Sequence, residues 1–223
     1  SLMATVNEPA AVTLSATASN ISCNGSLNGA VNVTAGGGTT PYNFNWSNGA
    51  TTQNLTGIAA GNYVVTVSDL NNCTTSASTS VTQPSAITIS LTKTDISCFG
   101  AANGTITTTV SGGNSGYSFN WSHGPTSQNL NALSAGSYTL TVTDASNCSV
   151  SGIETVSQPT QIILSETHAD VSCNNGSNGS ISITANGGSS GFSYLWNNTA
   201  TTSSINNLTA NAYSVTVTDV SLC

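Results

Sequence analysis

The sequence has little charge of either sign and almost no positive charge. Its 223 residues include one basic side chain, Lys93, against eight carboxylates, and only 4% of the residues are charged. Proteins hold phosphate groups largely with Lys and Arg, so nucleic acid and anionic membrane surfaces are poor partners for this chain. Disordered chains combine low hydrophobicity with high charge, whereas 37% of these residues are hydrophobic, which favours a folded protein.

Long apolar runs are also missing. No stretch approaches the roughly 18 apolar residues that a membrane-spanning helix needs. The opening residues, SLMATVNEP, have neither the basic nor the apolar region of a secretory signal peptide. We therefore expect no membrane span and no signal peptide here, which leaves either a cytosolic protein or an internal piece of a secreted one.

The residues that carry enzyme chemistry do not form any recurring set. No Gly-x-Ser-x-Gly motif is present, and the two histidines, His123 and His168, have no counterparts at matching positions. The segments TAGGGTTP, SGGNSG and NGGSSG are glycine-rich, but no Lys-Ser/Thr pair follows, so they are interpreted as turns. We predict no enzyme, no catalytic residues and no cofactor.

A recurring aspartate is a candidate calcium ligand. Asp69, Asp144 and Asp219 lie in the turn-like segments DLNN, DASN and DVSL. Calcium needs several converging oxygen ligands, and each of these turns offers a single carboxylate. We therefore expect turns without a metal site.

What the sequence does contain is a repeat of 75 residues. Cysteines, tryptophans, tyrosines, aspartates and prolines all recur at this step without a single insertion, for example at Trp46, Trp121 and Trp196. The Glu/Gln-Pro pairs mark the boundaries. The predicted domains are residues 10–84, 85–159 and 160–223; residues 1–9 are expected to be the tail strand of a preceding repeat, and the third repeat to stop before its last strand.

Each repeat has the pattern of β-structure. Short segments such as AVTLSAT, GAVNVTA and NYVVTVSD are rich in β-formers and separated by Asn/Gly clusters, and no segment keeps a helical period. The fold class predicted is all-β: a tandem array of small immunoglobulin/fibronectin-III-like antiparallel β-sandwich domains. The segment LTGIAAGNYVVTV resembles the tyrosine corner of such domains. Gly61, Gly136 and Asn211, two residues before each corner tyrosine, are expected to be left-handed.

Aromatic side chains recur at alternate positions of one segment in each repeat, as in YNFNWSNGATTQN. Alternate residues of a strand face the same side, so the three rings share one face and the Asn and Ser residues share the other. Exposed rings would suit a sugar, whereas buried rings would form the core between two sheets. We interpret the rings as core, together with the corner tyrosines. The predicted core aromatics are Tyr42, Phe44, Trp46, Tyr63, Tyr117, Phe119, Trp121, Tyr138, Phe192, Tyr194, Trp196 and Tyr213.

The six cysteines are expected to form disulfides, because their spacing does not suit zinc and no repeated histidine accompanies them. Disulfides place a protein outside the reducing cytosol. The pairing favoured is within repeats, where each bridge would contribute roughly 4 kcal/mol. An alternative joins Cys73 to Cys98 across a junction. The favoured pairs are Cys23 with Cys73, Cys98 with Cys148, and Cys173 with Cys223.

The run from Cys23 to Cys73 closely resembles the SprB-type repeat of giant surface proteins of Bacteroidota, which include the gliding-motility adhesin. The resemblance rests on Cys-Asn-Gly, Gly-Gly, aromatic-x-Trp-Ser-x-Gly, Ala-Gly-x-Tyr and a final cysteine, and it recurs in the other two repeats. Mild departures are Phe-Gly after Cys98, Asn-Asn after Trp196, and Ala-Asn at position 210. The resemblance implies a long extracellular array at the cell surface, exported by the type IX system and serving adhesion or gliding.

The leading hypothesis is therefore a structural and adhesive shaft of a cell-surface fibre. Scarce charge means weak repulsion, so a homo-oligomer or laterally associated filament is expected. A second hypothesis is a carbohydrate-binding module that is repeated for avidity, with a surface glycan as ligand. A third is a donor-strand fibre, in which residues 1–9 complete the last repeat of another chain.

Overall fold

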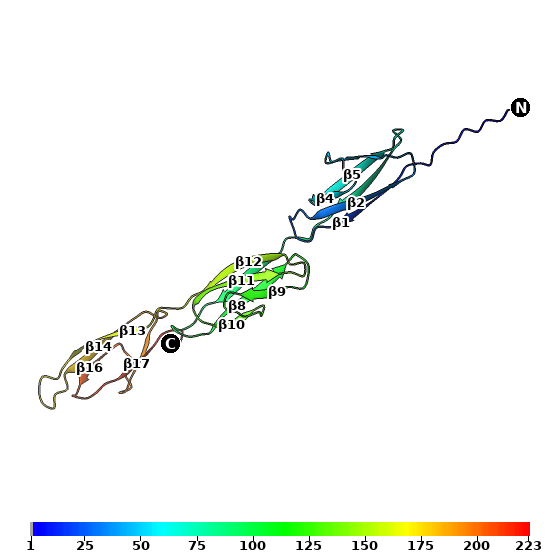
Figure 1. Cartoon of the computed structure of the whole chain (residues 1–223). Coiled ribbons are helices and arrows are strands. Elements are labelled where there is room, and N and C mark those ends of the chain that lie inside the picture. The colour runs from blue at the N-terminus through cyan, green and yellow to red at the C-terminus, as the bar shows by residue number, and fades with distance from the viewer. Residues whose placement is uncertain (1) are drawn as a thin grey trace. The chain divides into compact units, whose positions relative to one another are not determined.

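The computed structural model describes residues 2–223, and all regular structure in this range is β-strand (Figure 1). Ser1, the first residue of the expected tail strand, lies outside the described residues. No helix within residues 2–223 has the length and apolar character to cross a membrane. The strands are β1 (Thr13–Ser19), β2 (Gly29–Gly36), β3 (Asn43–Trp46), β4 (Leu55–Ile58), β5 (Gly61–Ser68), β6 (Thr74–Val81), β7 (Thr88–Thr94), β8 (Gly104–Ser111), β9 (Ser118–Trp121), β10 (Leu130–Leu133), β11 (Gly136–Thr143), β12 (Ser149–Val156), β13 (Ile163–Ala169), β14 (Gly179–Asn186), β15 (Ser193–Trp196), β16 (Ser204–Leu208) and β17 (Val215–Thr218).

Each predicted repeat contains two sheets of its own strands. In the first repeat the strand orders are β1-β2-β4 and β3-β5-β6, and the second repeat has the same arrangement in β10-β8-β7 and β12-β11-β9. The third repeat forms β13-β14-β16 and the two-stranded sheet β15-β17. Neighbouring strands of the first and third repeats run antiparallel. The chain is thus an all-β array of small immunoglobulin-like sandwiches, as predicted.

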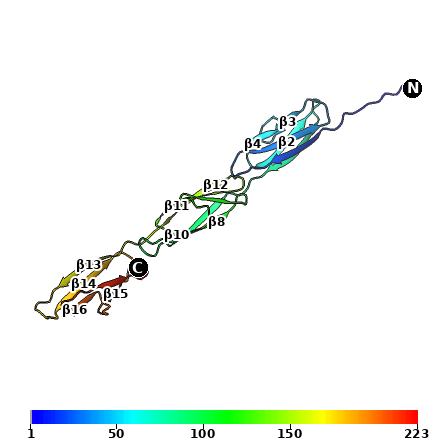
Figure 2. The ribbon, with the colours of Figure 1, turned by 60° about the horizontal axis from the view of Figure 1, so that its bottom comes forward.

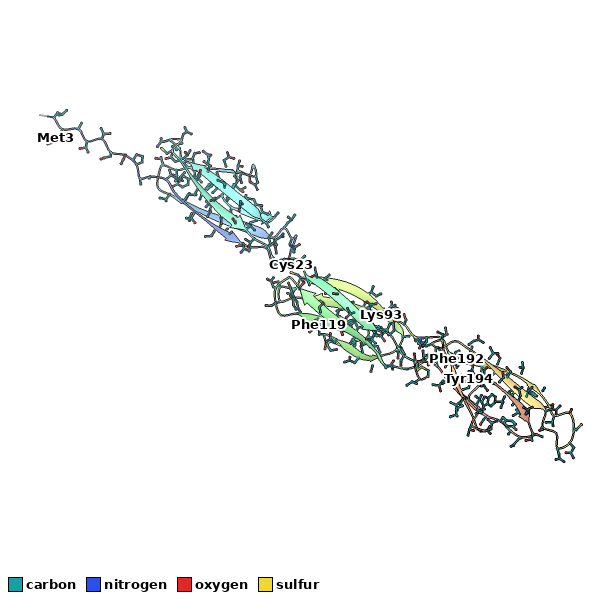
Figure 3. The ribbon with its side chains drawn as sticks, turned by 180° about the vertical axis from the view of Figure 1, so that it is seen from behind. Met3, Cys23, Lys93, Phe119, Phe192 and Tyr194 are labelled. Atoms are coloured by element: carbon teal, nitrogen blue, oxygen red, sulfur yellow. A yellow bond between two sulfur atoms is a disulfide. The ribbon has the colours of Figure 1, made fainter. Side chains whose placement is uncertain are left out.

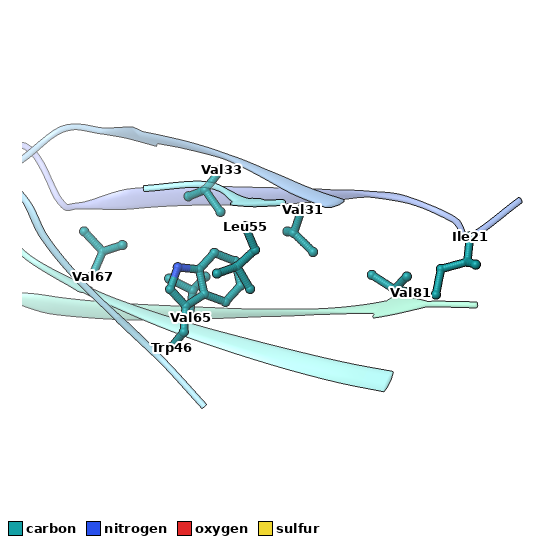
Figure 4. Close-up of a cluster of buried hydrophobic side chains, with 8 residues drawn as sticks. All are labelled: Ile21, Val31, Val33, Trp46, Leu55, Val65, Val67 and Val81. Atoms are coloured by element: carbon teal, nitrogen blue, oxygen red, sulfur yellow. The ribbon is translucent and has the colours of Figure 1, made fainter. Parts of the chain in front are cut away.

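The core of the first repeat lies between its two sheets (Figure 4). Val31 and Leu55 come from one sheet, and Trp46 and Val65 come from the other; all are at most 4% exposed. Apolar residues at alternate strand positions face inward, while the Asn, Ser and Thr residues between them face solvent. This alternation explains how a chain of such polar composition forms a core.

The chain divides into two compact units, and each is best described by itself. One unit extends to Ile89 and includes the segments Val110–Ser118 and Val142–Val150. The other consists of Ser90–Thr109, Phe119–Thr141 and Ser151–Cys223, and Figure 2 shows its strands β13 to β16 (gold to red). The three predicted domains, with boundaries at 84/85 and 159/160, stay a prediction. Residues 2–9, the expected tail strand, form no strand in this structure.

The residue with a left-handed backbone that recurs in each repeat is not the one that we expected. Gly61 and Gly136 have no positive φ, and neither does Asn211. Positive φ occurs instead four residues earlier, at Gly57 (φ 66°), Ala132 (54°) and Asn207 (57°). At each of these positions the pairing with the neighbouring strand shifts register, so this residue is the extra residue of a β-bulge.

The tyrosine corners form as the resemblance to immunoglobulin-like domains predicts. The hydroxyl of Tyr63 donates to the carbonyl of Ala59 at 2.9 Å. Tyr138 and Tyr213 make the equivalent bonds, four residues back along the chain, at 2.9 Å and 3.1 Å. Each hydroxyl therefore fixes the turn that precedes β5, β11 or the segment leading to β17.

Candidate functional site

The cysteines pair between repeats. Cys23 forms a disulfide with Cys148, with Cα atoms 5.6 Å apart, and Cys98 forms one with Cys223, with Cα atoms 5.5 Å apart. Cys73 and Cys173 are free and exposed. The predicted pairs Cys23–Cys73, Cys98–Cys148 and Cys173–Cys223 are therefore wrong, and the alternative Cys73–Cys98 is not formed either.

Strand β6 explains why pairing within a repeat fails. Cys73 directly precedes β6, while the loop of Cys23 lies at the other end, where the Ile21 nitrogen donates to the Thr82 carbonyl at 2.9 Å. An eight-residue strand spans roughly 25 Å at about 3.3 Å per residue. A disulfide tolerates a Cα separation of only about 7 Å. The two cysteines of one repeat thus lie at opposite ends of their sandwich.

The first cysteine of each repeat lies in a loop that is closed by a Ser–Asn pair. In the first repeat the Asn28 Nδ2 donates to the Ser22 Oγ at 2.7 Å, and the Ser26 nitrogen donates to the Cys23 carbonyl at 3.1 Å. The same pair closes the loops of Cys98 and Cys173, through Asn103 and Asn178. The loop therefore has the same hydrogen bonds whether or not its cysteine is bridged.

This loop also holds the segment that leads into the next repeat. The Gln83 Oε1 accepts a hydrogen bond from the Gly25 nitrogen at 2.8 Å, and the Asn24 Nδ2 donates to the Pro84 carbonyl at 3.0 Å. Gln158 repeats the first contact with the Gly100 nitrogen at 2.9 Å. In the sequence, Gln83 and Gln158 were used only as members of the boundary pairs, and the closing asparagines were not singled out, although the 75-residue register contains all of them.

The recurring aspartate positions the second cysteine of each repeat. The Asp69 Oδ1 accepts hydrogen bonds from the nitrogens of Asn71 and Cys73, both at 2.9 Å, while its Oδ2 accepts one from the Thr39 nitrogen at 2.9 Å. Asp144 and Asp219 bind their own turns, including Cys148 and Cys223, in the same way. These aspartates are 2–4% exposed. The carboxylate therefore joins the cysteine turn to the glycine-rich loop.

The hydrogen bonds also determine the charge of these carboxyl groups. The Thr39 nitrogen, followed by the Cys73 nitrogen, lowers the pKa of Asp69 below its ordinary value, and burial opposes this only in part. Backbone hydrogen bonds also lower the pKa values of Asp144 and Asp219. The largest effect on Asp144 comes from the Asn114 nitrogen, and the largest effect on Asp219 comes from the Ser189 nitrogen. Within residues 2–223, no group of three or more His, Cys, Asp or Glu side chains is placed to hold a metal ion. The aspartates act as hydrogen-bond acceptors for backbone.

The glycine pairs, which were interpreted as plain turns, contact the first residues of each repeat. The Gly113 nitrogen donates to the Ser85 carbonyl at 2.9 Å. Gly112 has a φ of 79°, and a Cβ on it would lie 1.9 Å from the Ala86 carbonyl oxygen. Gly37 and Gly187 are equally close to the carbonyls of Ala11 and Gln161, at 2.0 Å. The missing side chain therefore lets the incoming chain lie directly against this loop.

The two junctions have the same construction. A pocket of ≈ 410 Å³ next to Cys23–Cys148 is lined by Asn24, Pro84, Gly113 and Asp144. A smaller pocket of ≈ 240 Å³ next to Cys98–Cys223 is lined by the residues 75 positions later, including Phe99, Pro159 and Gly188. Asn114 adds a contact at the first junction, where its Nδ2 donates to the Ser22 carbonyl at 3.2 Å. Figure 3 labels Cys23 at this place.

The aromatic rings lie on the inner faces of their strands. The three tryptophans, Trp46, Trp121 and Trp196, are 2–3% exposed, and each Nε1 donates to a backbone carbonyl at 2.8–2.9 Å. The other rings at the alternate positions of these segments are half-buried, and the residues between them are exposed. Figure 3 labels Phe119, Phe192 and Tyr194 among them. The half-buried rings are Tyr42, Phe44, Tyr117, Phe119, Phe192 and Tyr194. Of the corner tyrosines, Tyr63 and Tyr213 are also half-buried, and Tyr138 is buried.

The comparison with protein families follows this repeat structure. The model described as "SprB repeat" matches residues 15–51, 90–126 and 165–201, in the same 75-residue register. The chain belongs to the SprB repeat family. Each SprB match begins in the first strand of a repeat and includes the first cysteine, the glycine pair and the tryptophan. The second cysteine lies outside each match. No curated protein matches the chain.

Solved structures with some similarity to these SprB repeats contain immunoglobulin domains. The structure titled "Structural basis for Dscam isoform specificity" is 12% identical, and the match covers 68% of this chain and 46% of the chain in that structure, with a TM-score of 0.30. "Structure of amphioxus IgVJ-C2 molecule" shares 12% identity and covers 68% and 99%, with a TM-score of 0.27. The chain thus spans about half of the first structure. Scores this low carry no argument, and the fold assignment rests on the strand pairing itself.

Proposed function

We propose that this chain is a structural shaft segment of a long extracellular cell-surface fibre. The observation that carries the proposal is the pair of disulfides, Cys23–Cys148 and Cys98–Cys223, which connect successive SprB repeats in one register. Covalent bridges between successive repeats suit a shaft, because they keep the connections between repeats when force acts along the chain.

The bridges overlap along the chain, which suits this role. The first encloses residues 23–148 and the second encloses residues 98–223, so the stretch from Cys98 to Cys148 lies within both. Unfolding a sandwich therefore releases only part of its chain length. In addition, the peptide link at Pro84 is supplemented by the bridge and by the hydrogen bonds of Gln83 and Asn24.

Several observations support a location outside the cell. Structural disulfides persist in oxidising surroundings, and SprB repeats are characteristic of cell-surface proteins. The low charge supports lateral association of such fibres. Adhesion, gliding or attachment to other cells are the tasks that this fibre serves, with export by the type IX system. The role is structural, not enzymatic.

Immunogold electron microscopy of intact cells tests the proposal. Antibodies raised against the purified chain are expected to label filaments that extend from the cell outline, and brief treatment of the cells with external protease is expected to remove the label. A parallel lysed sample controls for antibody access. Labelling that appears only after lysis would show an intracellular protein and contradict the proposal.

A further inference from the structure

The first and last strands of a repeat lie side by side and run in the same direction. In the first repeat these strands, β1 and β6, are in contact. Near their starts, Val12 and Thr74 line one pocket together. Just beyond their ends, the Ile21 nitrogen donates to the Thr82 carbonyl at 2.9 Å. The chain therefore enters the sandwich along β1 and leaves it along β6, and both strands end where the link to the next repeat begins.

The second repeat has the same arrangement in β7 and β12. Ile87, just before β7, and Ser149, the first residue of β12, line one pocket beside the first bridge. Beyond the ends of both strands, the Ile96 nitrogen donates to the Ser157 carbonyl at 2.9 Å. The first and last strands of this repeat are thus aligned at their starts and at their ends.

The first bridge joins two of these strands end to end. Cys23 follows β1, and its partner Cys148 directly precedes β12. The backbone then continues from β12 through Pro159 into β13 (Figure 1). A continuous covalent path, called the first path below, therefore runs through β1, the Cys23–Cys148 bridge, β12 and β13.

A second path runs through the other strands. β6 continues through Pro84 into β7, and Cys98, which follows β7, is bridged to Cys223. At the first junction the first path crosses through a disulfide and the second path through the peptide link at Pro84. At the second junction the first path crosses through the link at Pro159 and the second path through a disulfide. Each junction thus contains one disulfide and one peptide link, which belong to different paths.

The backbone of both paths is extended. Residues 74–96 and 149–171 contain no turn, no bend and no positive φ. Gln83 and Gln158 each precede a proline, which restricts them to extended conformations. Within residues 2–223, every positive φ belongs to a residue that lies between the first and the second cysteine of its repeat. The left-handed turns of the chain are therefore confined to the segments between these cysteines.

Strands that are already extended release little length under tension. A force favours unfolding in proportion to the length that unfolding releases. A β-strand already rises about 3.3 Å per residue, and a fully stretched chain reaches at most about 3.6 Å per residue. The segments between the cysteines are folded back on themselves and would release far more, but the bridges remove them from the route of the force. Force along the two paths therefore has almost no length to release.

We propose that the two paths carry the tension along this chain, and that the segments between the cysteines of a repeat lie outside the route of the force. Such load-bearing strands deepen the proposed shaft function, on which this assignment of the load rests. Each junction divides the load between a disulfide and a peptide link. Tension accordingly does not favour unfolding of the sandwiches, and a break in one path leaves the other path intact.

Optical tweezers can load the first path between two defined points. In a C73S chain Cys173 is the one remaining free thiol, so one handle is joined to it through a thioether and the other to an N-terminal tag. Between low force and full extension the bridged chain should gain less than about 50 Å, because its path is already extended. Reductant opens Cys23–Cys148 and should release roughly 400 Å more, since the route then includes the 125-residue separation of these cysteines. A gain of more than about 50 Å before reductant is added would overturn the proposal.

Two insertion variants of the same chain show which residues bear the force. One has about 10 flexible Gly and Ser residues inserted between Ser157 and Gln158, in the link of the first path; the other has the same insert between Asn48 and Gly49, in an exposed turn between two cysteines. At full extension of the bridged chain, the insert in the link should add roughly 35 Å and the insert in the turn less than about 10 Å. After reduction both inserts should add the same length. Equal lengthening in the bridged chains would refute the assignment of the load.

A C98S/C223S variant in the same background is the control for the second bridge. The route between these two handles contains only the first bridge, so the extension should stay unchanged, and a larger gain would contradict the first path. These results are independent of the immunogold labelling. A large gain before reductant refutes the two paths even where filaments on cells are labelled, whereas label that appears only after lysis contradicts the shaft function even where the gain is small.

Discussion

Cys23 in the first repeat forms a disulfide with Cys148 in the second, across a sequence separation of 125 residues. Cys98 and Cys223 repeat this relationship one register later, with the same separation. Every bridge thus starts in the loop that holds the outgoing chain and ends in the turn held by a buried aspartate. The junction between repeats therefore combines a disulfide, a hydrogen-bonded loop and a turn that a buried carboxylate holds.

The overlapping bridges predict how far the chain lengthens under force. Each bridge connects two cysteines that are 125 residues apart in the sequence, so the chain between them cannot extend. This shortens the fully extended length of the protein by roughly 400 Å. When the ends of the chain are pulled by atomic force microscopy, the double variant C23S/C148S should still withhold about this length, because Cys98–Cys223 remains. Only reductant, or removal of both bridges, should release it. A full release in the double variant would show that the second bridge is absent.

The cysteine pairing shows where sequence reasoning stops. The 75-residue register reveals that the cysteines recur and that their partners must recur too. It does not say that Cys23 and Cys73 lie at opposite ends of β6, because this depends on which strands pair. The left-handed residues are a similar case: the bulge at Gly57 follows from its pairing with β2, and Ala132 shows that glycine is not required there.

The alternating strand of aromatics, in contrast, could be interpreted from the sequence alone. Trp46→Ala should lower the free energy of unfolding of the first repeat by about 3–5 kcal/mol, since it leaves a cavity and removes the Nε1 bond to the Thr52 carbonyl. Hydrogen exchange followed by mass spectrometry resolves this loss by repeat. Val64→Ala is the control, because Val64 is 42% exposed and should cost less than about 0.5 kcal/mol. Equal effects of both would place Trp46 outside the core.

The buried aspartates predict a dependence of stability on pH. Backbone nitrogens, first that of Thr39, lower the pKa of Asp69 in the folded state below 3.8. The folded protein therefore binds this proton less readily than the unfolded chain does. The stabilisation is fully present above pH 3.8 and is lost as the pH falls through the lowered pKa.

Asp69→Asn should accordingly lower the melting temperature at pH 7 and lower it less at pH 2, because the stabilisation declines as the pH falls below 3.8 towards the lowered pKa of the wild-type carboxyl. Differential scanning calorimetry across this range measures the difference. Asp170→Asn removes the same charge from a side chain that is 92% exposed, and it should leave the melting temperature unchanged at both pH values. A difference between Asp69→Asn and wild type that persists undiminished at pH 2 would mean that the carboxylate charge is not the cause.

The glycine pair predicts a contrast between two glycines that both have a positive φ. Gly37 has a φ of 69°, and a Cβ on it would lie 2.0 Å from the Ala11 carbonyl oxygen, whereas Gly49 has a φ of 85° and nothing within 4 Å. Alanine at Gly49 should therefore cost only the left-handed conformation, about 1–2 kcal/mol. Alanine at Gly37 adds a clash with the Ala11 carbonyl oxygen, which belongs to the backbone and cannot rotate away. The first residues of the repeat must therefore move away from the glycine-rich loop. Urea denaturation should show a clearly larger loss for Gly37→Ala, with faster hydrogen exchange at residues 10–12; equal losses would mean that the close approach contributes nothing.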